Sequence, residues 1–424
     1  MQKLKEIKTT EVGKIPDDWK LIHLNEIVDI NPETIDKKYS FEDIKYIDIG
    51  SVENYQIKKY EHFKLSERPS RAQRIVRKND IIVSTVRPYL HGFAKIVDSL
   101  HSLICSTGFA VLRPKDLRTV DFIFNFIKSQ YFESQLNTHM TGLAYPAVTS
   151  KIVGNTILGY PKNKNEIEKI GNILSNVVKL IQKTDQIIEQ TQRLKKGLMQ
   201  RLLTKGIGHN QFKKVALSSL NISNMTQIAC EWEVKTLKDI AVINPESINE
   251  KYSNTEINYI EIGAIRNYEI QEYVVHNLSK RPSRAQRVVR KGDIIVSTVR
   301  PYLRGFTLIN DSRPNLICST GFAVIRPKNK QDENFIFNYI KSKLFEDNIF
   351  RSMEGMAYPA ITSSDVANSI IPYPKDKKEM IKIGSLLYNI DSSIKLKYSY
   401  KLKLEILKKG LMQQLLTGKI RVKV

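Results

Sequence analysis

Apolar residues recur in steps of three and four along two long stretches of the chain. The first stretch runs from Ile170 to Leu198 and the second from Ile383 to Leu411, and neither contains proline. This spacing is typical of a coiled-coil seam, and a helix of about 40 residues reaches roughly 60 Å. We therefore predict one long helix at 162–205 and a second one, followed by a C-terminal tail, at 375–424, and we expect the two to form an antiparallel coiled coil. The predicted seam comprises Ile173, Val177, Leu180, Ile187, Leu194, Leu198, Leu386, Ile390, Leu404, Leu407 and Leu411.

Two features interrupt this seam. Gly197 and Gly410 lie before the last helical turns, where each costs about 1 kcal/mol relative to Ala. They either allow a neighbour to approach closely or mark the end of a helix. Polar residues also fall on the seam, and they either fix its register or face solvent because the seam drifts. These residues are Thr184, Thr191, Ser393 and Lys397.

Outside the helices the pattern changes to short β-branched runs bounded by Gly, Pro, Asn and Asp. Residues 44–114 are mostly of this kind, which predicts strands. Residues 119–139 have helical spacing with one apolar face, and a further short strand ends at Tyr160-Pro161. The fold class that follows is α+β. We expect a first globular domain at 1–161, a connector at 206–228 and a second domain at 229–374.

The chain contains this domain twice. Residues 68–114 and 281–327 are identical at 37 of 47 positions without a gap, and the same offset of 213 relates Trp19 to Trp232. A repeat of this length is a duplicated domain with its joining helix, because solenoid units have periods of about 20–50 residues. Two such copies joined by antiparallel helices predict an internal pseudo-two-fold axis.

The charge of the chain points to a polyanionic partner. A net charge of +23 and a pI near 9.6 accompany 41% hydrophobic residues, so the charge belongs to a folded scaffold. Three cysteines form neither a disulfide framework nor a C-x-x-C metal site. No apolar run approaches the length of about 20 that spans a bilayer, and the N-terminus lacks a signal-peptide core. We expect a cytoplasmic protein without a membrane partner.

The duplicated segment is rich in side chains that suit nucleic acid. It contains SRAQR and STVRPYL, and the similar loops GLAYPAVTS and GMAYPAITS follow in the two copies. Arg bridges guanine O6 and N7, Gln bridges adenine N6 and N7, and Ser or Thr serves base or phosphate. The pattern does not divide these residues between base and phosphate contacts. The predicted DNA-binding residues are Arg68, Ser70, Arg71, Gln73, Arg74, Arg77, Thr85, Arg87, Tyr89, Tyr145, Arg281, Ser283, Arg284, Gln286, Arg287, Arg290, Thr298, Arg300, Tyr302, Arg304 and Tyr358.

Motifs for catalysis are missing from both copies. There is no P-loop, no Gly-rich S-adenosylmethionine loop and no metal-binding or nucleophile–His–acid set at the 213 offset. The string PDDWK at 16–20 contains an acidic–x–Lys triplet like that of metal-dependent nucleases, but Glu233 replaces Lys20 in the copy. A duplicated enzyme that kept its arginines should also have kept its catalytic groups. The sequence therefore favours a DNA-binding protein that is not an enzyme and has no metal site.

Several strings resemble the specificity (S) subunit of type I restriction–modification systems. They are GKIPDDWK at 13–20, DIIVST at 80–85 and 293–298, LKKGLMQRLLTKGI at 194–207 and LKKGLMQQLLTGKIRV at 407–422. The order domain, helix, domain, helix covers the whole chain. The family usually enters each helix through a Pro-Pro-x-x-Glu-Gln-like segment, whereas this chain has YPKNKNEIEKI and YPKDKKEMIKI.

This resemblance implies an adaptor without catalysis. Each α+β domain would be a target-recognition domain that reads one half of a bipartite double-stranded DNA site. The paired helices would set the spacing and dock two methyltransferase (M) subunits, with restriction (R) subunits joining the complex. This chain would bind no cofactor, because S-adenosylmethionine, ATP and Mg²⁺ belong to those partners. The partners would methylate adenine after flipping it out of the duplex.

The duplication adds one inference of its own. Two near-identical readers related by a two-fold axis should read two near-identical, inverted half-sites, which make an interrupted palindrome. The alternatives are a stand-alone regulator that uses the coil as its dimer axis and a catalytic DNA recombinase or nuclease. Neither the bases read nor the spacer length follows from the sequence.

Overall fold

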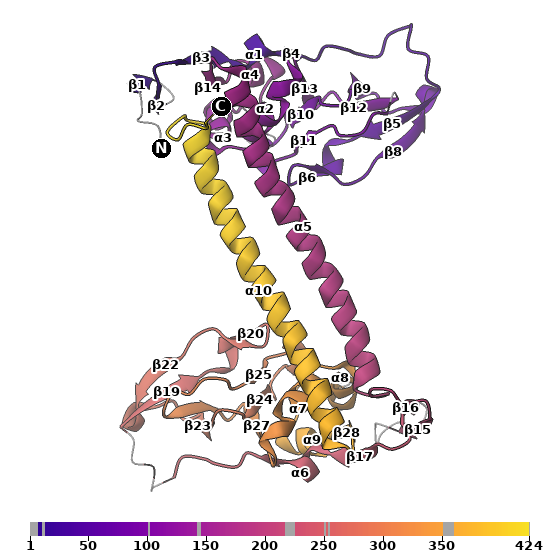
Figure 1. Cartoon of the computed structure of the whole chain (residues 1–424), viewed down its shortest axis with the longest axis vertical. Helices are drawn as coiled ribbons and strands as arrows, with labels where there is room; N and C mark the ends of the chain where they lie inside the picture. Colours follow the sequence, from indigo (N-terminus) through magenta and orange to yellow (C-terminus); the bar gives the residue numbers. More distant parts are fainter. Residues whose placement is uncertain are drawn as a thin grey trace. The chain divides into compact units, whose positions relative to one another are not determined.

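The computed structural model describes residues 7–10, 13–100, 102–141, 146–216, 225–249, 252, 255–350 and 360–423. It divides into two compact units. Unit 1 consists of Met1–Asp185 with Ser399–Val424, and unit 2 consists of Gln186–Tyr398. Each unit therefore contains one globular domain, part of helix α5 (Lys164–Leu202) and part of helix α10 (Lys377–Leu415) (Figure 1).

The globular part of unit 1 is built mainly from short strands. Its elements are β1 (Ile7–Thr10), β2 (Gly13–Pro16), β3 (Trp19–His23), α1 (Leu24–Ile27), β4 (Val28–Ile30), β5 (Asp43–Ile47), η1 (Ile49–Ser51), β6 (Val52–Glu53), β7 (Gln56–Ile57), β8 (Glu61–Lys64), η2 (Leu65–Glu67), β9 (Ala72–Ile75), β10 (Ile81–Ser84), η3 (Pro88–Leu90), β11 (Phe93–Lys95), β12 (Leu103–Ser106), β13 (Phe109–Pro114), η4 (Leu117–Thr119), α2 (Val120–Ile127), α3 (Gln130–Thr138), α4 (Ser150–Gly154) and β14 (Ile157–Pro161).

Unit 2 repeats this order, including the hairpin that precedes the domain. Its elements are β15 (Phe212–Ala216), β16 (Met225–Ala229), β17 (Glu233–Thr236), α6 (Leu237–Ile240), β18 (Ala241–Ile243), β19 (Glu256–Ile260), η5 (Ile262–Ala264), β20 (Ile265–Arg266), β21 (Glu269–Ile270), β22 (Val274–Asn277), η6 (Leu278–Lys280), β23 (Ala285–Val288), β24 (Ile294–Ser297), η7 (Pro301–Leu303), β25 (Phe306–Leu308), β26 (Leu316–Ser319), β27 (Phe322–Pro327), η8 (Lys330–Asp332), α7 (Glu333–Ile340), α8 (Lys343–Phe350), α9 (Ser363–Asn368) and β28 (Ile370–Tyr373).

Two four-stranded sheets form the centre of unit 1. One has the strand order β11-β10-β13-β4 and is antiparallel, and the other has the order β8-β5-β12-β9 with β12 parallel to β5. Successive side chains of β10 point to opposite faces, so Ile82 enters the core between the sheets while Ile81 and Val83 pack with the helices. Both faces of β10 are covered, which explains its uninterrupted apolar run. Unit 2 has the same two sheets.

The helical segment of the domain is two helices, which corrects the single helix expected at 119–139. α2 ends at Ile127 and α3 begins at Gln130. Ser129 lies between them with an extended backbone, and its Oγ accepts a hydrogen bond from the Phe132 amide at 3.2 Å. Serine competes for backbone hydrogen bonds and favours this N-cap position, so it starts a new helix. The expected connector likewise contains an element, because β15 and β16 form a hairpin within it.

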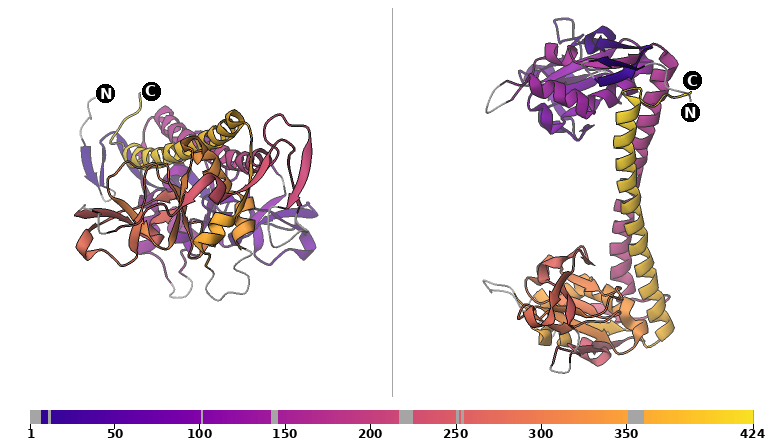
Figure 2. Two further views of the ribbon diagram at one scale, coloured as in Figure 1. Left: turned by 90° about the horizontal axis from the view of Figure 1, so that it is seen from below. Right: turned by 90° about the vertical axis from the view of Figure 1, so that its left-hand side faces the viewer.

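The predicted antiparallel helix pair is confirmed within each unit. In unit 1 the Lys401 ammonium lies 2.7 Å from the Asp185 carboxylate. In unit 2 the Lys195 ammonium pairs with Asp391. Later residues of α5 thus meet earlier residues of α10. Both views of Figure 2 place the end of α10 beside the start of α5 in unit 1.

The seam lies one residue away from several predicted positions. Val177 and Leu404 are buried as expected, but Leu180 is 45% exposed and Leu194 is 59% exposed. Leu180 is followed by the apolar Ile181, so periodicity alone permits either one to face inward, whereas Leu194 stands between Arg193 and Lys195. Contact with the domain selects the second residue of such an apolar pair at Leu174 and Leu387, which join the two domain cores. Leu386 and Leu407 are also exposed, and Ile173, Ile187, Leu198, Ile390 and Leu411 are partly buried.

The two helix glycines do not mark helix ends, which was one of the two alternatives expected for them. Gly197 and Gly410 lie inside α5 and α10, which continue to Leu202 and Leu415. Within the described part of the chain, a Cβ added at either glycine would meet no atom within 4 Å. No neighbour in this chain therefore requires glycine there. No helix of the described residues has the length and apolar character needed to cross a membrane.

Candidate nucleic-acid interface

Loops from different parts of the sequence meet at one end of the two sheets in unit 1. The Thr107 amide donates to the Arg71 carbonyl at 2.8 Å, which joins the turn after β12 to the loop before β9. The Thr85 amide donates to the Gly108 carbonyl at 2.8 Å, and this bond joins the same turn to the segment after β10. These contacts follow from strand direction, since β9 and β12 are antiparallel and so are β10 and β13.

The GLAYPAVTS loop joins the same cluster. The Val148 amide donates to the Thr85 carbonyl at 2.9 Å, and the Arg87 amide donates to the Pro146 carbonyl at 2.8 Å. We call residues 68–71, 85–92, 106–108 and 146–150, with 281–284, 298–305, 319–321 and 360–363 of unit 2, the recognition loops. The structure thus brings together motifs that the sequence separates by about 60 residues.

Each recognition cluster presents polar and apolar side chains to solvent. Ser70, Arg71 and Gln73 are exposed, and Gln73 Nε2 donates to the Ser70 carbonyl at 2.8 Å. The η3 turn exposes 41% of Tyr89 and 60% of Leu90. Such a combination of hydrogen-bonding donors beside an aromatic ring suits contact with base edges and base faces.

A left-handed backbone shapes this turn. Arg87 has φ 47° and ψ 56°, and the buried Pro88 follows it at the first position of η3. A non-glycine residue in this region is uncommon and costs of order 1 kcal/mol or more. Unit 2 has the same geometry at Arg300, with φ 48°. The strain turns Tyr89 and Leu90 outward together.

Unit 2 repeats the cluster with its own residues. The Thr320 amide donates to the Arg284 carbonyl at 2.9 Å, and the Ile361 amide donates to the Thr298 carbonyl at 2.9 Å. Tyr302 is 47% exposed and Leu303 is 67% exposed. The other exposed candidates are Ser283, Arg284, Gln286, Arg300 and Arg304. Sequence reasoning missed Leu90 and Leu303, although an apolar residue beside Pro-Tyr in a turn was a usable signal.

Two predicted arginines have partners inside the protein. Arg74 Nη1 donates to Asn31 Oδ1 at 2.8 Å and to the Phe109 carbonyl. Arg287 makes the same bonds to Asn244 and Phe322. Burial lowers the pKa of both guanidinium groups. These contacts fasten β9 and β23 to the neighbouring sheet and explain the arginines without DNA, so DNA contact by them stays a prediction.

Two further pairs of predicted residues also have internal partners. Thr85 Oγ1 donates to the Gly108 carbonyl at 2.8 Å, and Thr298 Oγ1 donates to Gly321. Arg68 Nη1 donates to the Leu65 carbonyl at 2.7 Å. Its counterpart Arg281 binds Leu278. These bonds hold the recognition loops in shape.

Arg77 and Arg290 lie away from the recognition loops. Each follows the far end of its strand, β9 or β23, and Arg77 Nη2 is 2.6 Å from Glu33. Burial raises the pKa of Glu33, but hydrogen bonds from Arg113 and Arg77 outweigh it and hold the pKa below its usual value. Arg290 pairs with Glu246 at 2.7 Å. The structure therefore separates these arginines from Arg71, which the sequence pattern grouped with Arg77.

Arg304 was predicted in the second copy only, because its counterpart in the first copy is His91. His91 of unit 1 lies 3.4 Å from Glu133, whereas its counterpart Arg304 lies 2.6 Å from Glu346. Glutamates at equivalent positions thus contact a histidine in one copy and an arginine in the other. Tyr145 and Tyr358 lie outside the described residues.

The acidic triplet in PDDWK has a structural partner. Asp18 receives a pair of hydrogen bonds from Arg421, at 2.8 and 2.9 Å, and Glu166 binds the same guanidinium. Across the described ranges, no group of three His, Cys, Asp or Glu residues is arranged to hold a metal ion. The triplet fastens the C-terminal segment to unit 1.

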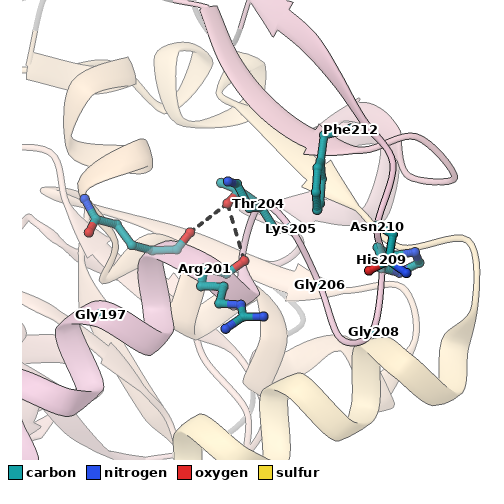
Figure 3. A pocket seen from close by; sticks show the side chains of 10 residues that line it. Gly197, Arg201, Thr204, Lys205, Gly206, Gly208, His209, Asn210 and Phe212 are labelled. Carbon is teal, nitrogen blue, oxygen red and sulfur yellow. Dashed lines mark hydrogen bonds between the residues drawn. The ribbon is translucent and has the colours of Figure 1, made fainter.

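The connector of unit 2 lines a cavity of about 740 Å³ (Figure 3). Thr204 Oγ1 donates to the carbonyl of Gln200 at 2.7 Å beside it. His209 Nε2 lies 3.0 Å from both oxygens of Glu379, and Glu379 also accepts from the Trp232 indole. This cavity involves none of the predicted site residues.

Comparison with known proteins identifies the family to which these loops belong. A family model described as "Type I restriction modification DNA specificity domain" matches residues 16–193 and again residues 230–406. The chain belongs to the type I restriction–modification DNA specificity family. Its function is DNA recognition for such a system, as the resemblance predicted. The two matched segments correspond to the two copies of the repeat, and each covers one globular domain and most of the helix that follows it.

Similarity to other members of this family extends over most of the chain. The MjaVIII specificity subunit of Methanocaldococcus jannaschii is 29% identical over 333 residues, which cover 76% of this chain and 75% of that protein. The putative MjaX specificity subunit of the same organism is 27% identical over 99% of this chain and 98% of its own length. The solved S subunit from M. genitalium has the same fold, with a TM-score of 0.60, 16% identity and coverage of 94% and 96% of the two chains.

Proposed function

We propose that each unit of this specificity subunit reads one half of a bipartite DNA site and that the two half-sites are nearly identical and inverted. The observation that carries this proposal is the duplicated set of exposed side chains on the recognition loops and on the adjoining strands β9 and β23. Ser70, Arg71, Gln73 and Tyr89 recur as Ser283, Arg284, Gln286 and Tyr302. Equal side chains on equal backbones favour equal bases. The antiparallel pairing of α5 and α10 supports the inverted order.

Recognition also requires general affinity for the duplex. The net charge of +23 supplies it, because neutralised phosphates release counterions and binding weakens steeply with salt. Exposed arginines at the loops direct this affinity to base edges. Tyr89 and Leu90, and the matching pair in unit 2, are placed to contact bases or to wedge between them.

The partners in this proposal are two methyltransferase subunits and the restriction subunits of the system. Apolar residues on the outer face of α10 support docking there, since Leu402 is 58% exposed and Ile406, one turn later, is 64% exposed. This chain would contribute specificity without catalysis. S-adenosylmethionine, ATP and Mg²⁺ would be bound by the partners, and the cytoplasmic location stays a prediction.

Mapping methylated adenines in cells with and without the gene tests the half-site proposal. We expect modified sites that disappear with the gene and consist of two closely related, inverted sequences around a fixed spacer. Two unrelated half-sites would contradict the equality of the readers. Sites that persist without the gene would contradict the function itself.

A co-purification experiment tests the docking face. L402K combined with I406K should remove the methyltransferase from the purified complex, while DNA binding by this chain alone is retained. The control K403A changes an exposed neighbour on the same helix and should keep the partner. If the wild-type chain co-purifies with no methyltransferase, the result would favour the alternative that this chain is a stand-alone DNA-binding regulator.

A further inference from the structure

Unit 2 contains a carboxylate held between a buried lysine and a partly buried one. Lys341 follows α7, and its side chain is 5% exposed. Its ammonium lies 2.5 Å from Asp391 Oδ2 and 4.3 Å from the centre of the Phe337 ring. Lys195, on α5, pairs with the other carboxylate oxygen of Asp391. Such charges are stable when buried because each has a partner.

Unit 1 contains the same two lysines without the carboxylate. Lys128 is the counterpart of Lys341 at the offset of 213, and its ammonium lies 4.1 Å from the centre of the Phe124 ring. Lys408 is the counterpart of Lys195. The position equivalent to Asp391 is Val178, which carries no charge. Among the described residues, neither Lys128 nor Lys408 has a carboxylate within 4 Å of its ammonium.

These two lysines line a cavity of about 1160 Å³. The charged residues around it are Lys128, Lys408, Lys409, Lys419, Glu133 and Glu405, together with His91. Glu133 lies 3.4 Å from His91, and Glu405 lies 3.8 Å from Lys401. The charge of Glu405 also acts on Lys408, although its carboxylate is more than 4 Å from that ammonium. Lys95, whose charge also acts on Lys128, is paired with Asp121 at 2.6 Å. Four lysines against two glutamates leave the cavity positive.

Aromatic and aliphatic side chains complete the lining. Tyr55, Phe126, Tyr131 and Met412 surround the cavity, and the Tyr55 ring centre is 5.8 Å from the Lys128 ammonium. Burial and the charge of Lys408 lower the pKa of Lys128 to about 7. An anion between the two ammonium groups would offset this cost, as Asp391 does in unit 2.

We propose that Lys128 and Lys408 of unit 1 form a binding site for a carboxylate supplied from outside the chain, in the place that Asp391 fills in unit 2. The ligand is a small carboxylic acid or the acidic side chain of a bound protein, and both present the same charged group. The two units thus differ at this site. In unit 2 the carboxylate between the lysines belongs to the chain, and in unit 1 a ligand supplies it.

The experiment uses the full chain and acetate or succinate as probes, with chloride at equal ionic strength as the control. Urea unfolding of unit 1 is followed through Trp19 in a W232F background, since the chain has two tryptophans, one buried in each unit. We expect the unfolding midpoint of unit 1 to rise saturably with acetate and not with chloride. An equal effect of chloride overturns the proposal.

Three variants complete the test. V178D should supply the missing carboxylate, raise the midpoint without acetate and abolish the acetate response. K128M should also abolish the response, and a retained response in either variant overturns the proposal. D391V should create the same site in unit 2, where Trp232 in a W19F background would then report an acetate response that the parent lacks. If V178D does not fold, K128M and D391V still decide the question.

The source of the ligand is distinguished by repeating the titration on the assembled complex with the methyltransferase. If a small acid is the ligand, the acetate response persists in the complex. If a partner side chain is the ligand, the response is lost on assembly and returns when the chain is freed. A response absent from both preparations overturns the site.

Discussion

Replacing Lys128 with methionine removes a buried ammonium group and keeps the length of the side chain. The pKa of Lys128 is lowered from 10.5 to about 7 by burial and by the charge of Lys408. Between these pH values the unfolded chain holds a proton that the folded chain lacks, so stability falls as the pH falls from 10.5 to about 7. At about 1.4 kcal/mol per pH unit, the full cost is roughly 5 kcal/mol, and it is reached below about pH 7.

We expect K128M to stabilise unit 1 by about 1–4 kcal/mol at pH 7 and to have little effect near pH 10.5, because water in the cavity lowers the full cost. The assay is urea unfolding at several pH values in chloride buffer, with Trp19 as the reporter in a W232F background. K341M in a W19F background is the matched control. Burial lowers the pKa of Lys341 only to about 8, because Asp391 raises it. K341M should therefore stabilise unit 2 at pH 7 by about 1.4 kcal/mol less than K128M stabilises unit 1. The reasoning would be refuted if K128M stabilised unit 1 equally at pH 7 and pH 10, or if it destabilised unit 1 at pH 7.

Three other predictions concern Arg421, the recognition loops and the paired helices. R421M should destabilise unit 1 by about 3 kcal/mol in the Trp19 assay, because the carboxylate of Glu166 is 2% exposed and loses its partner; an unchanged midpoint would contradict this. R71A should relax one half-site in methylome mapping and R284A the other, and a change in both halves from either variant would be inconsistent with two separate readers. A fragment of residues 1–212 should self-associate, since the end of α5 in one copy can replace the end of α10 that unit 1 needs; sedimentation as a stable monomer at tens of micromolar would count against it.

The duplicated motifs predicted a set of candidate DNA-binding residues, but they did not predict which of those side chains are exposed. Ser70, Arg71, Gln73 and Tyr89 are exposed as a DNA reader requires. Arg74 stands in the same string and points into the protein, where Asn31 and the Phe109 carbonyl accept its hydrogen bonds. Alternation along a strand separates neighbours onto opposite faces, and the residues that receive Arg74 come from distant parts of the chain.

For the helices too, the sequence predicted the element but not which of its residues are buried. Steps of three and four predicted both helices and their antiparallel pairing, because an apolar stripe must be buried against another. The exact seam is ambiguous wherever two apolar residues are adjacent, as at Ile173 and Leu174. Packing against the domain buries Leu174 completely, so at this position the buried residue is one later than predicted.

The sequence by itself determined the domain order, the duplication, the helix pair and the family, because each is written in local spacing or in repeated strings. Only the tertiary structure decided which polar groups have partners. Lys128 and Lys341 are identical in type and repeat position, yet Lys341 meets Asp391 and Lys128 faces a cavity. That difference depends on a residue 50 positions away, Val178 or Asp391, on another helix. Electrostatic environment is set by proximity in space, and folding is what brings such residues together.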